Sequence, residues 1–399
     1  MEFTPLSVQV EELTQYLRKR EKFADSDLNV VVSPYRISPL GAHIDHQGGP
    51  VLGMTINTGS LLAFIPNHER KVRLYSMNYP GIVEFSIENI KTARRNDWGR
   101  YAMGAAKVIH EHKSIELGFT GVIMGTLPAS GLSSSASAAL AYLKALAYVN
   151  NRILSNEDYV ELDSGIENNY LKLQNGILDQ SSIVYGKKNS MLYIDTVSAE
   201  VTAHLKPEST EDFRILILYS GLTHELTSSG FNTRVRACRK TAALLGLMGG
   251  LNSARILSDI PEEVYLAQQK RLPEDIKKWA IHYFSEVGRV KKGIKAWNIG
   301  ELEKFGSLMN ESSGSTLQNY EDSSPEIRYL FERTISQDGV YGAAINGGGY
   351  GGCVVAFVRN EFAESSGSDI LHSYTKEFPE LREHAAVYFT EPDEGLRLF

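Results

Sequence analysis

The chain has 399 residues, of which 42% are hydrophobic and 22% charged, an ordinary globular composition with room for two domains. Its formal net charge of −7, from 41 basic and 48 acidic residues, argues against a general nucleic-acid binder. The two cysteines, Cys238 and Cys353, belong to no Cys/His cluster, so they argue against a structural zinc site and suit a reducing compartment.

The first element that the pattern predicts is a helix at residues 8–22, where apolar side chains recur at helical spacing. The N-terminus lacks the apolar core of a signal peptide, and no apolar run reaches the roughly 18 residues of a membrane span. We therefore expect a cytoplasmic protein with no membrane partner.

The rest of the chain alternates between strand and helix patterns. Strand composition predicts these early strands: 28–33, ended by Pro34, then 51–64, 72–75, 82–87 and 119–124. Helical patterns occupy 98–110, 135–149 and most of 233–336. Later strands are expected at 190–195, 213–219, 341–345, 352–358 and 384–389. The polar stretch 196–212 is the candidate junction between two domains, 1–205 and 206–399.

A phosphate-binding loop is indicated by the segment Pro128-Ala-Ser-Gly-Leu-Ser-Ser-Ser-Ala136, which leads into an alanine-rich helix. Small residues let a backbone approach phosphates closely, and a helix start offers free N–H groups and partial positive charge. An ordinary N-cap would explain one serine but not the whole segment. The segment is not a Walker loop, because no Gly-Lys-Ser/Thr follows it.

Two further segments combine glycines with polar residues. Asn346-Gly-Gly-Gly-Tyr-Gly-Gly352 lies between two predicted strands, and by itself it is at least as compatible with a flexible hairpin as with a functional loop. The segment from Pro34 to Gly49 carries Arg36, His43, Asp45 and His46 between a strand and a Gly-Gly turn, which suggests a shaped site.

Together these segments resemble the GHMP kinases, and most of all their galactokinase branch. The branch motif Gly-Glu-His-Thr-Asp-Tyr is matched by Gly41-Ala-His-Ile-Asp-His46, and Cys-Gly-Ile-Met-Asp-Gln by Asn175-Gly-Ile-Leu-Asp-Gln180. Two sparser motifs correspond to Trp98, Tyr101 and Gly104, and to Tyr320, Ser323, Pro325 and Glu326. The plant galacturonokinases are similar in two of these segments: they also carry Gly-Ala-His-Ile-Asp-His-Gln-Gly-Gly and Asn-Gly-Ile-Leu-Asp-Gln-Ser.

The resemblance implies an α/β (α+β) fold of two domains. The N-terminal, ATP-binding domain would be like the second domain of ribosomal protein S5 and the C-terminal domain ferredoxin-like, with the active site between them. It also implies an enzyme that uses ATP and Mg²⁺ to phosphorylate a small sugar or uronic acid. In such a reaction the protein mainly positions groups and stabilises charge.

By match to the family, Asp179 would be the catalytic base at the anomeric hydroxyl, and Arg36 would neutralise charge there and on the transferring phosphoryl group. The resemblance assigns the nucleotide to Gly131, Leu132, Ser133, Ser134, Ser135 and, near the base or only in the core, Trp98. Mg²⁺ would be bound by Ser135 and Glu167, with nearby Asp163 as a weaker rival.

On the sugar side, His43 and Asp45 match residues that bind hydroxyls, and Gly348 and Gly349 would pack close to the sugar or the transferred phosphate. Ala42 stands where galactokinases have a glutamate against the C6 hydroxyl. A glutamate would repel a C6 carboxylate by about 1 kcal/mol in water and about 4 kcal/mol at an intermediate dielectric, at roughly 4 Å. The alternative is that the alanine is a neutral sequence change and that another residue binds a neutral sugar.

A second departure is Phe231, where the branch usually has a sugar-binding tyrosine. The loss of its hydroxyl puts one sugar hydrogen bond in doubt. Arg234, Arg236 and His46 are candidate partners of a uronate carboxylate, although each is equally compatible with a surface role.

The sequence therefore favours a kinase that converts D-galacturonate to galacturonate 1-phosphate. The alternatives are a galactokinase and a non-catalytic sensor that binds sugar and ATP. The presence of Asp179, Arg36 and the three serines 133–135 argues against the sensor.

Overall fold

The computed structural model describes residues 4–91, 94, 97–128, 131–173, 175–222, 230–321, 323–347 and 351–399, apart from the side chain of Phe231. Its strands are β1 (Asn29–Leu40), β2 (Val51–Asn67), β3 (Lys71–Ser76), β4 (Val83–Ser86), β5 (Gly118–Gly125), β6 (Ser190–Ile194), β7 (Val201–Leu205), β8 (Phe213–Tyr219), β9 (Val340–Asn346), β10 (Cys353–Arg359), β11 (Ala386–Thr390) and β12 (Arg397–Leu398). Its α-helices are α1 (Leu6–Arg18), α2 (Arg100–Lys113), α3 (Ser134–Val149), α4 (Asn156–Ser164), α5 (Leu178–Tyr185), α6 (Phe231–Met248), α7 (Glu262–Gln268), α8 (Glu274–Asn298), α9 (Leu302–Ser315), α10 (Pro325–Ile335) and α11 (Glu364–Glu377). The mixed α/β expectation is confirmed.

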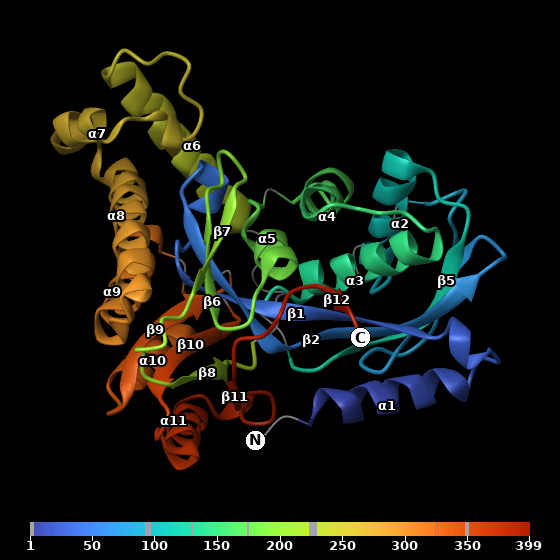
Figure 1. Ribbon diagram of the computed structural model, residues 1–399. Coiled ribbons are helices and arrows are strands. Elements are labelled where there is room, and N and C mark those ends of the chain that lie inside the picture. Colours follow the sequence, from blue (N-terminus) through green and yellow to red (C-terminus); the bar gives the residue numbers. More distant parts are fainter. Residues whose placement is uncertain are drawn as a thin grey trace.

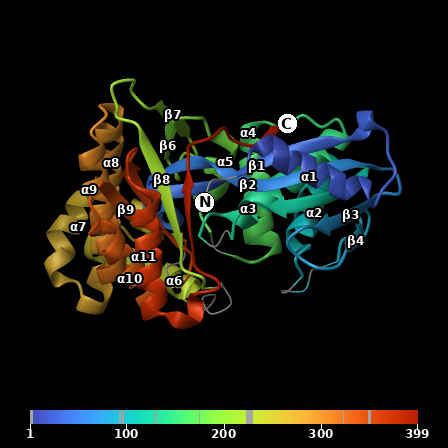
Figure 2. The same ribbon diagram turned by 90° about the horizontal axis from the view of Figure 1, so that it is seen from below.

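The larger sheet follows the order β12-β1-β2-β5-β3-β4, and β6 joins it by pairing with both β2 and β7. Neighbouring side chains on β1 point to opposite faces, as the two-residue repeat of a strand requires. Val30 and Val32 pack with α1, whereas Val31 packs with α2 and α3. The sheet therefore lies between α1 on one face and the helices α2 to α5 on the other (Figures 1 and 2).

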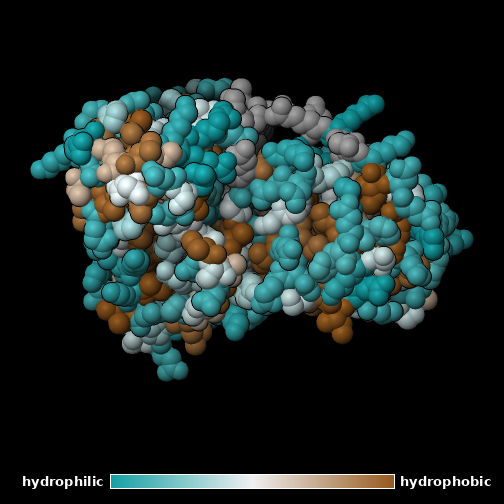
Figure 3. Space-filling view, turned by 90° about the horizontal axis from the view of Figure 1, so that it is seen from above, coloured by the Kyte–Doolittle hydropathy of each residue, from teal (hydrophilic) through white to brown (hydrophobic). Residues whose placement is uncertain are grey.

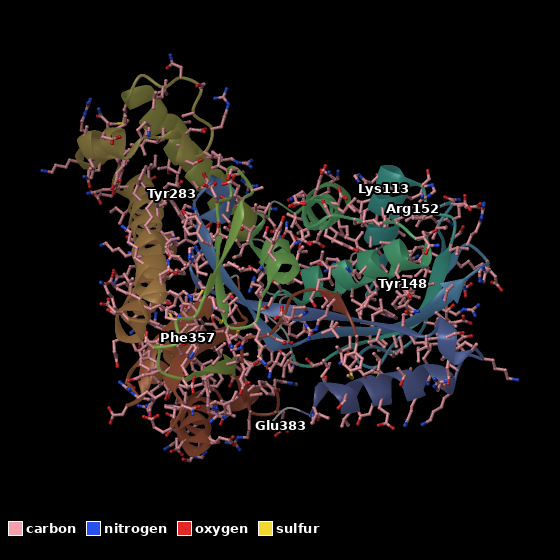
Figure 4. The ribbon with its side chains drawn as sticks, viewed as in Figure 1. Lys113, Tyr148, Arg152, Tyr283, Phe357 and Glu383 are labelled. Carbon is pink, nitrogen blue, oxygen red and sulfur yellow. The ribbon has the colours of Figure 1, made fainter. Side chains whose placement is uncertain are left out.

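The smaller sheet has the order β11-β8-β10-β9, and all its strand pairs are antiparallel. Ile215 and Ile217 of β8 face the core beneath α8 and α9, and Leu216 and Leu218 face α10 and α11. Phe357 of β10 lies in the first of these cores, where its ring centroid is 4.7 Å from that of Phe213 (Figure 4).

A hollow separates two lobes of the molecule (Figure 3). The lobe formed by α6, α7 and α8 stands on one side of it and the lobe formed by α2 and α4 on the other (Figure 1). A space-filling view from above shows hydrophilic rims, with apolar side chains exposed in the hollow between the two lobes (Figure 3). Among the described residues, no helix combines the length and apolarity needed to cross a membrane.

One prediction about the strands is wrong. Strand β1 does not end at Pro34 but continues to Leu40, with register shifts after Pro34 and after Ile37. A bulge tolerates the missing proline N–H, and Gly59 opposite lets β2 approach, because a side chain there would overlap the carbonyl oxygen of Ser33. The polar stretch 196–212, the candidate junction, contains β7, which pairs with β6.

The expected division at residues 205 and 206 falls between β7 and β8, which belong to different sheets. We propose this boundary for the two domains. Strand β12 is then the exception, because it returns to the larger sheet and pairs with β1 through Val31 and Val32.

Candidate active site

Arg36 and Asp179, which are 143 residues apart in the sequence, form an ion pair that joins β1 to α5. The register shift in β1 precedes Arg36, whose side chain is buried. Its Nε and Nη2 atoms donate to Oδ1 of Asp179 at 2.9 and 2.8 Å, and Nη1 donates to the carbonyl oxygen of Gly131 at 2.9 Å. One guanidinium thus joins the first motif, the Asp179 motif and the phosphate loop.

Asp179 occupies the first turn of α5, where the positive end of the helix dipole and Arg36 both stabilise a negative carboxylate. Both contacts from Arg36 go to Oδ1, and Oδ2 accepts no hydrogen bond from the part of the chain that the structure describes. The side chain is 24% exposed. This arrangement leaves one oxygen able to accept a proton from a bound hydroxyl.

The phosphate loop turns through two residues with positive φ, Gly131 at 89° and Ser133 at 59°, before α3 begins at Ser134. A side chain at Gly131 would overlap the carbonyl of Asn346, and Gly347 packs against the Gly131 backbone from the other side. Gly131 of the serine loop therefore lies against Asn346, Gly347 and Cys353, the described ends of the late glycine loop. The Ser133 hydroxyl is buried and has no hydrogen-bond partner in the described part of the chain, as expected if it binds a ligand.

The residues expected to bind a metal lie around Tyr101. Its hydroxyl lies near Ser135, in the first turn of α3, and within electrostatic range of Glu167. The carboxylate of Glu167 is almost fully buried and accepts a hydrogen bond of 3.0 Å from Asn175. Burial and the negative charge of Asp179 raise the pKa of Glu167 to about 7. Glu167 is thus a buried carboxylate with hydroxyl groups nearby, and it forms no ion pair with a described residue. Such an arrangement of oxygen atoms fits a hard divalent cation.

An aromatic pair lies near the other end of the phosphate loop. The rings of Trp98 and Tyr79 are stacked, with centroids 6.3 Å apart and planes 14° apart, and Tyr79 is 59% exposed. Asn78 holds this loop to the end of β5 through two hydrogen bonds with the Gly125 backbone. Trp98 was expected from the sequence; Tyr79 was not, because a single aromatic residue in a turn gives no motif.

Residues that the sequence predicts on the sugar side of the site lie at Tyr320. The ring of His43 stacks on that of Tyr320 at 4.5 Å with an interplanar angle of 2°, and His46 Nε2 lies 3.0 Å from the tyrosine hydroxyl. Asp45 packs against Gly176, just before the helix that carries Asp179. Burial and the charge of Asp179 raise the pKa of Asp45 to about 6.

The backbone of Ala42 is clamped by α8. A carboxylate oxygen of Glu286 accepts hydrogen bonds from the N–H groups of Gly41 and Ala42, at 2.8 and 3.2 Å. His282 lies 2.8 Å from the Ala42 carbonyl oxygen. Sequence reasoning missed Glu286 and His282; a polar pair four residues apart on a long helix was the available signal, and it is typical of many surface helices.

Arg234, Arg236 and His46, the three candidate partners of a uronate carboxylate, have different surroundings. Arg234 is 7% exposed and donates to the backbone carbonyls of Tyr320 and Glu321 at 3.1 and 2.6 Å. It lies close enough to His43 to help lower the pKa of that imidazole. Arg236 is exposed and donates to Thr233, and His46 binds Tyr320 and Gln47. Arg234 is therefore the one of the three cationic candidates that is buried at the sugar side.

Three expectations fall outside the described residues. They concern Gly348 and Gly349 of the late glycine loop and the side chain of Phe231. Their proposed contacts with the sugar remain predictions from the sequence.

The buried histidines give the site a predictable pH response. Burial lowers the pKa of His46 from 6.5 to about 4. Burial also lowers the pKa of His43. Between pH 6.5 and about 4 the unfolded chain binds a proton at His46 that the folded chain does not, so acid favours unfolding. We expect this group to remove stability on the order of 3 kcal/mol as the pH falls through that range.

Urea unfolding at a series of pH values measures this effect. The variant His46→Gln, which retains a polar partner for Tyr320, should show a shallower loss of stability between pH 6.5 and 4. His43 titrates in the same direction, so part of the slope should persist. An unchanged slope in the variant would mean that His46 is protonated in the folded protein.

Comparison with known proteins gives a consistent assignment. A model of the GHMP kinases N terminal domain matches residues 100–187, and a model of the GHMP kinases C terminal region matches residues 291–376. A galacturonokinase of Arabidopsis thaliana is 38% identical over 392 residues, which cover 93% of this chain and 92% of that protein. A galactokinase of Clostridium perfringens is 32% identical over 358 residues, covering 88% and 91% of the two chains.

A solved structure of Lactococcus lactis galactokinase complexed with galactose has the same architecture. It matches with a TM-score of 0.88 at 28% sequence identity, and the match covers 98% of this chain and 99% of that one.

Proposed function

Because the chain belongs to the GHMP kinase family and has its two-domain fold, we propose that it phosphorylates D-galacturonate at the anomeric hydroxyl, giving galacturonate 1-phosphate. It is an ATP-dependent sugar kinase. The observation that carries the choice of substrate is Ala42, a side chain without charge at the clamped position beside the sugar-side residues.

The nearby carboxylate of Glu286 does not take over the role of a sugar-binding glutamate. Its side chain has no solvent exposure, and its two oxygens are occupied by the backbone of Gly41 and Ala42, the Ser312 hydroxyl and Arg289. Glu286 is therefore proposed not to face a C6 oxygen beside Ala42, because protein donors surround its carboxylate and Arg289 balances its charge. A uronate meets less repulsion there than it would beside a glutamate.

The positive charge at this side supports the same substrate class. Arg234 is the charged partner proposed for the carboxylate, and it lies beside His43 and Tyr320. His43 and His282 have pKa values lowered by burial, so at neutral pH they act as neutral hydrogen-bonding groups. His43 and Asp45 are proposed to bind the remaining hydroxyls.

For the chemical step, Asp179 is proposed to accept the anomeric proton on Oδ2 as the sugar oxygen attacks the γ-phosphorus of ATP. Arg36 keeps the carboxylate in place through Oδ1 and stabilises charge on the transferring group. The N–H groups of Gly131, Leu132, Ser133 and Ser134, at the start of α3, are proposed to bind the phosphates. ADP leaves with the electron pair of the broken bond.

Ser135 and Glu167 are proposed to bind Mg²⁺, since the hydroxyl and the buried carboxylate supply the oxygen ligands it prefers. When bound, the cation neutralises phosphate charge during transfer. The stacked rings of Trp98 and Tyr79 offer a flat apolar surface to the nucleotide base.

A panel of sugars in a coupled ADP-release assay tests the proposal. Initial rates with galacturonate, glucuronate and galactose at equal concentration should be highest with galacturonate. A clear preference for galactose would replace the uronate assignment with that of a galactokinase, the activity named for several relatives. Binding of sugar and ATP without ADP release would instead indicate a sensor.

A further inference from the structure

A second buried carboxylate lies beside the proposed metal ligand Glu167. Asp163 is the penultimate residue of α4, its side chain is fully buried, and neither of its oxygens has a hydrogen-bond partner among the residues that the structure describes. Buried carboxylates are normally paired or bound to a metal, because leaving one unpaired costs several kcal/mol. Asp163 therefore needs an explanation that its own neighbours in the protein do not provide.

The helix geometry directs Asp163 towards the metal site. Helix α4 continues without a break into the π-helical turn Gly165–Tyr170, which carries Glu167. Residues four apart on a helix lie on the same face, about one turn from each other. The carboxyl of Asp163 accordingly lies within electrostatic range of both Glu167 and Asp179.

The charge balance at this point favours a cation. Asp163 lies within electrostatic range of Glu167 and Asp179, and among the described residues the ion pair of Arg36 is made with Asp179. Glu167 is fixed on its other side by the neutral amide of Asn175. A bound divalent cation that retains part of its water shell would supply both the missing charge and hydrogen-bond donors for the Asp163 oxygens.

We propose that Asp163 is a positioning residue for the divalent cation: it accepts hydrogen bonds from the water shell of the ion held by Ser135 and Glu167, and so strengthens binding of that ion. This role rests on the metal site of the proposed function. Groups that orient metal ligands or metal-bound water commonly change metal affinity by 10- to 100-fold.

Cation binding can be measured directly, with Mn²⁺ as the probe. Mn²⁺ is titrated into the full chain in the presence of ADP, and the loss of its free EPR signal is compared with a protein-free ADP control. The variant Asp163→Asn should bind Mn²⁺ about 10- to 100-fold more weakly than the unmodified protein. Without cation, the same variant should unfold at a temperature no lower than that of the unmodified protein, because an unpaired buried acid has been removed.

Asp158→Asn is the matched control, the same chemical change on the same helix. Asp158 forms a capping box with Ser155, accepting from its backbone N–H at 2.9 Å, so its variant should unfold at a lower temperature and bind Mn²⁺ normally. Asp163→Ala is a second variant in case the asparagine variant does not fold.

The outcomes separate the two proposals. Unchanged Mn²⁺ affinity in the Asp163 variants, with normal binding by the unmodified protein, would overturn the role of Asp163 and leave the metal site intact. A lower unfolding temperature with unchanged affinity would make Asp163 purely structural. If the unmodified protein bound no more Mn²⁺ than ADP alone, the metal site itself would be wrong.

Discussion

Asp179→Asn should lower kcat by about 10²- to 10⁴-fold while sugar binding changes little, because general-base catalysis contributes rate enhancements of this size. Asparagine has nearly the same shape, and its side-chain oxygen can still accept the hydrogen bonds of Arg36 at the start of α5. The amide cannot accept the anomeric proton. The loss should therefore fall on the chemical step rather than on assembly of the site.

Steady-state ADP release with galacturonate gives kcat, and calorimetric titration with the sugar gives its affinity. Asp212→Asn is a suitable control, since Asp212 is exposed and pairs with Lys206 at 3.1 Å outside the site. It should leave both quantities unchanged. If Asp179→Asn kept more than a tenth of the kcat, Asp179 would act mainly by holding Arg36, and the proton would leave by another route.

Sequence reasoning could propose the candidate site where its residues stand in short contiguous motifs. The serine loop, Arg36 and Asp179 each stand in such a motif, so a chemical role could be proposed for each before its position was known. Their contact is a matter of tertiary structure, since one hydrogen bond from Arg36 spans 143 residues and another spans 95. The prediction that a strand ends at Pro34 was wrong because it ignored tertiary structure. The bulge opposite Gly59 depends on how β1 pairs with β2.

The parts that could not be predicted have no local pattern at all. Glu286 and His282 hold the backbone of Ala42 from 244 and 240 residues away. Their residue types are common on helices, and only packing gives them a role. Asp163 is an intermediate case: the sequence marked it as a weaker metal candidate, and its burial without partners is what the structure adds.

Ala42→Glu should reduce the preference for galacturonate over galactose by between about 5-fold and about 10³-fold. The range follows from a repulsion of about 1 to 4 kcal/mol between two carboxylates roughly 4 Å apart, depending on the local dielectric. The new side chain cannot easily turn away by a shift of the loop, because Glu286 and His282 hold the backbone of residue 42 on both sides. The ratio of kcat/KM for the two sugars measures the effect.

The glutamine variant at the same position isolates charge from size. Ala42→Gln fills the same volume without a negative charge, so any loss that it shares with Ala42→Glu is steric and should affect galacturonate and galactose alike. The additional loss of galacturonate activity in Ala42→Glu then measures the electrostatic repulsion between the new glutamate and the carboxylate of the sugar. Nearby His43 and His282 have pKa values lowered by burial and stay neutral at pH 7, so they do not cancel the added charge. Equal selectivity in the two variants would show that Ala42 matters for space alone, and the choice of a uronate would then rest on Arg234.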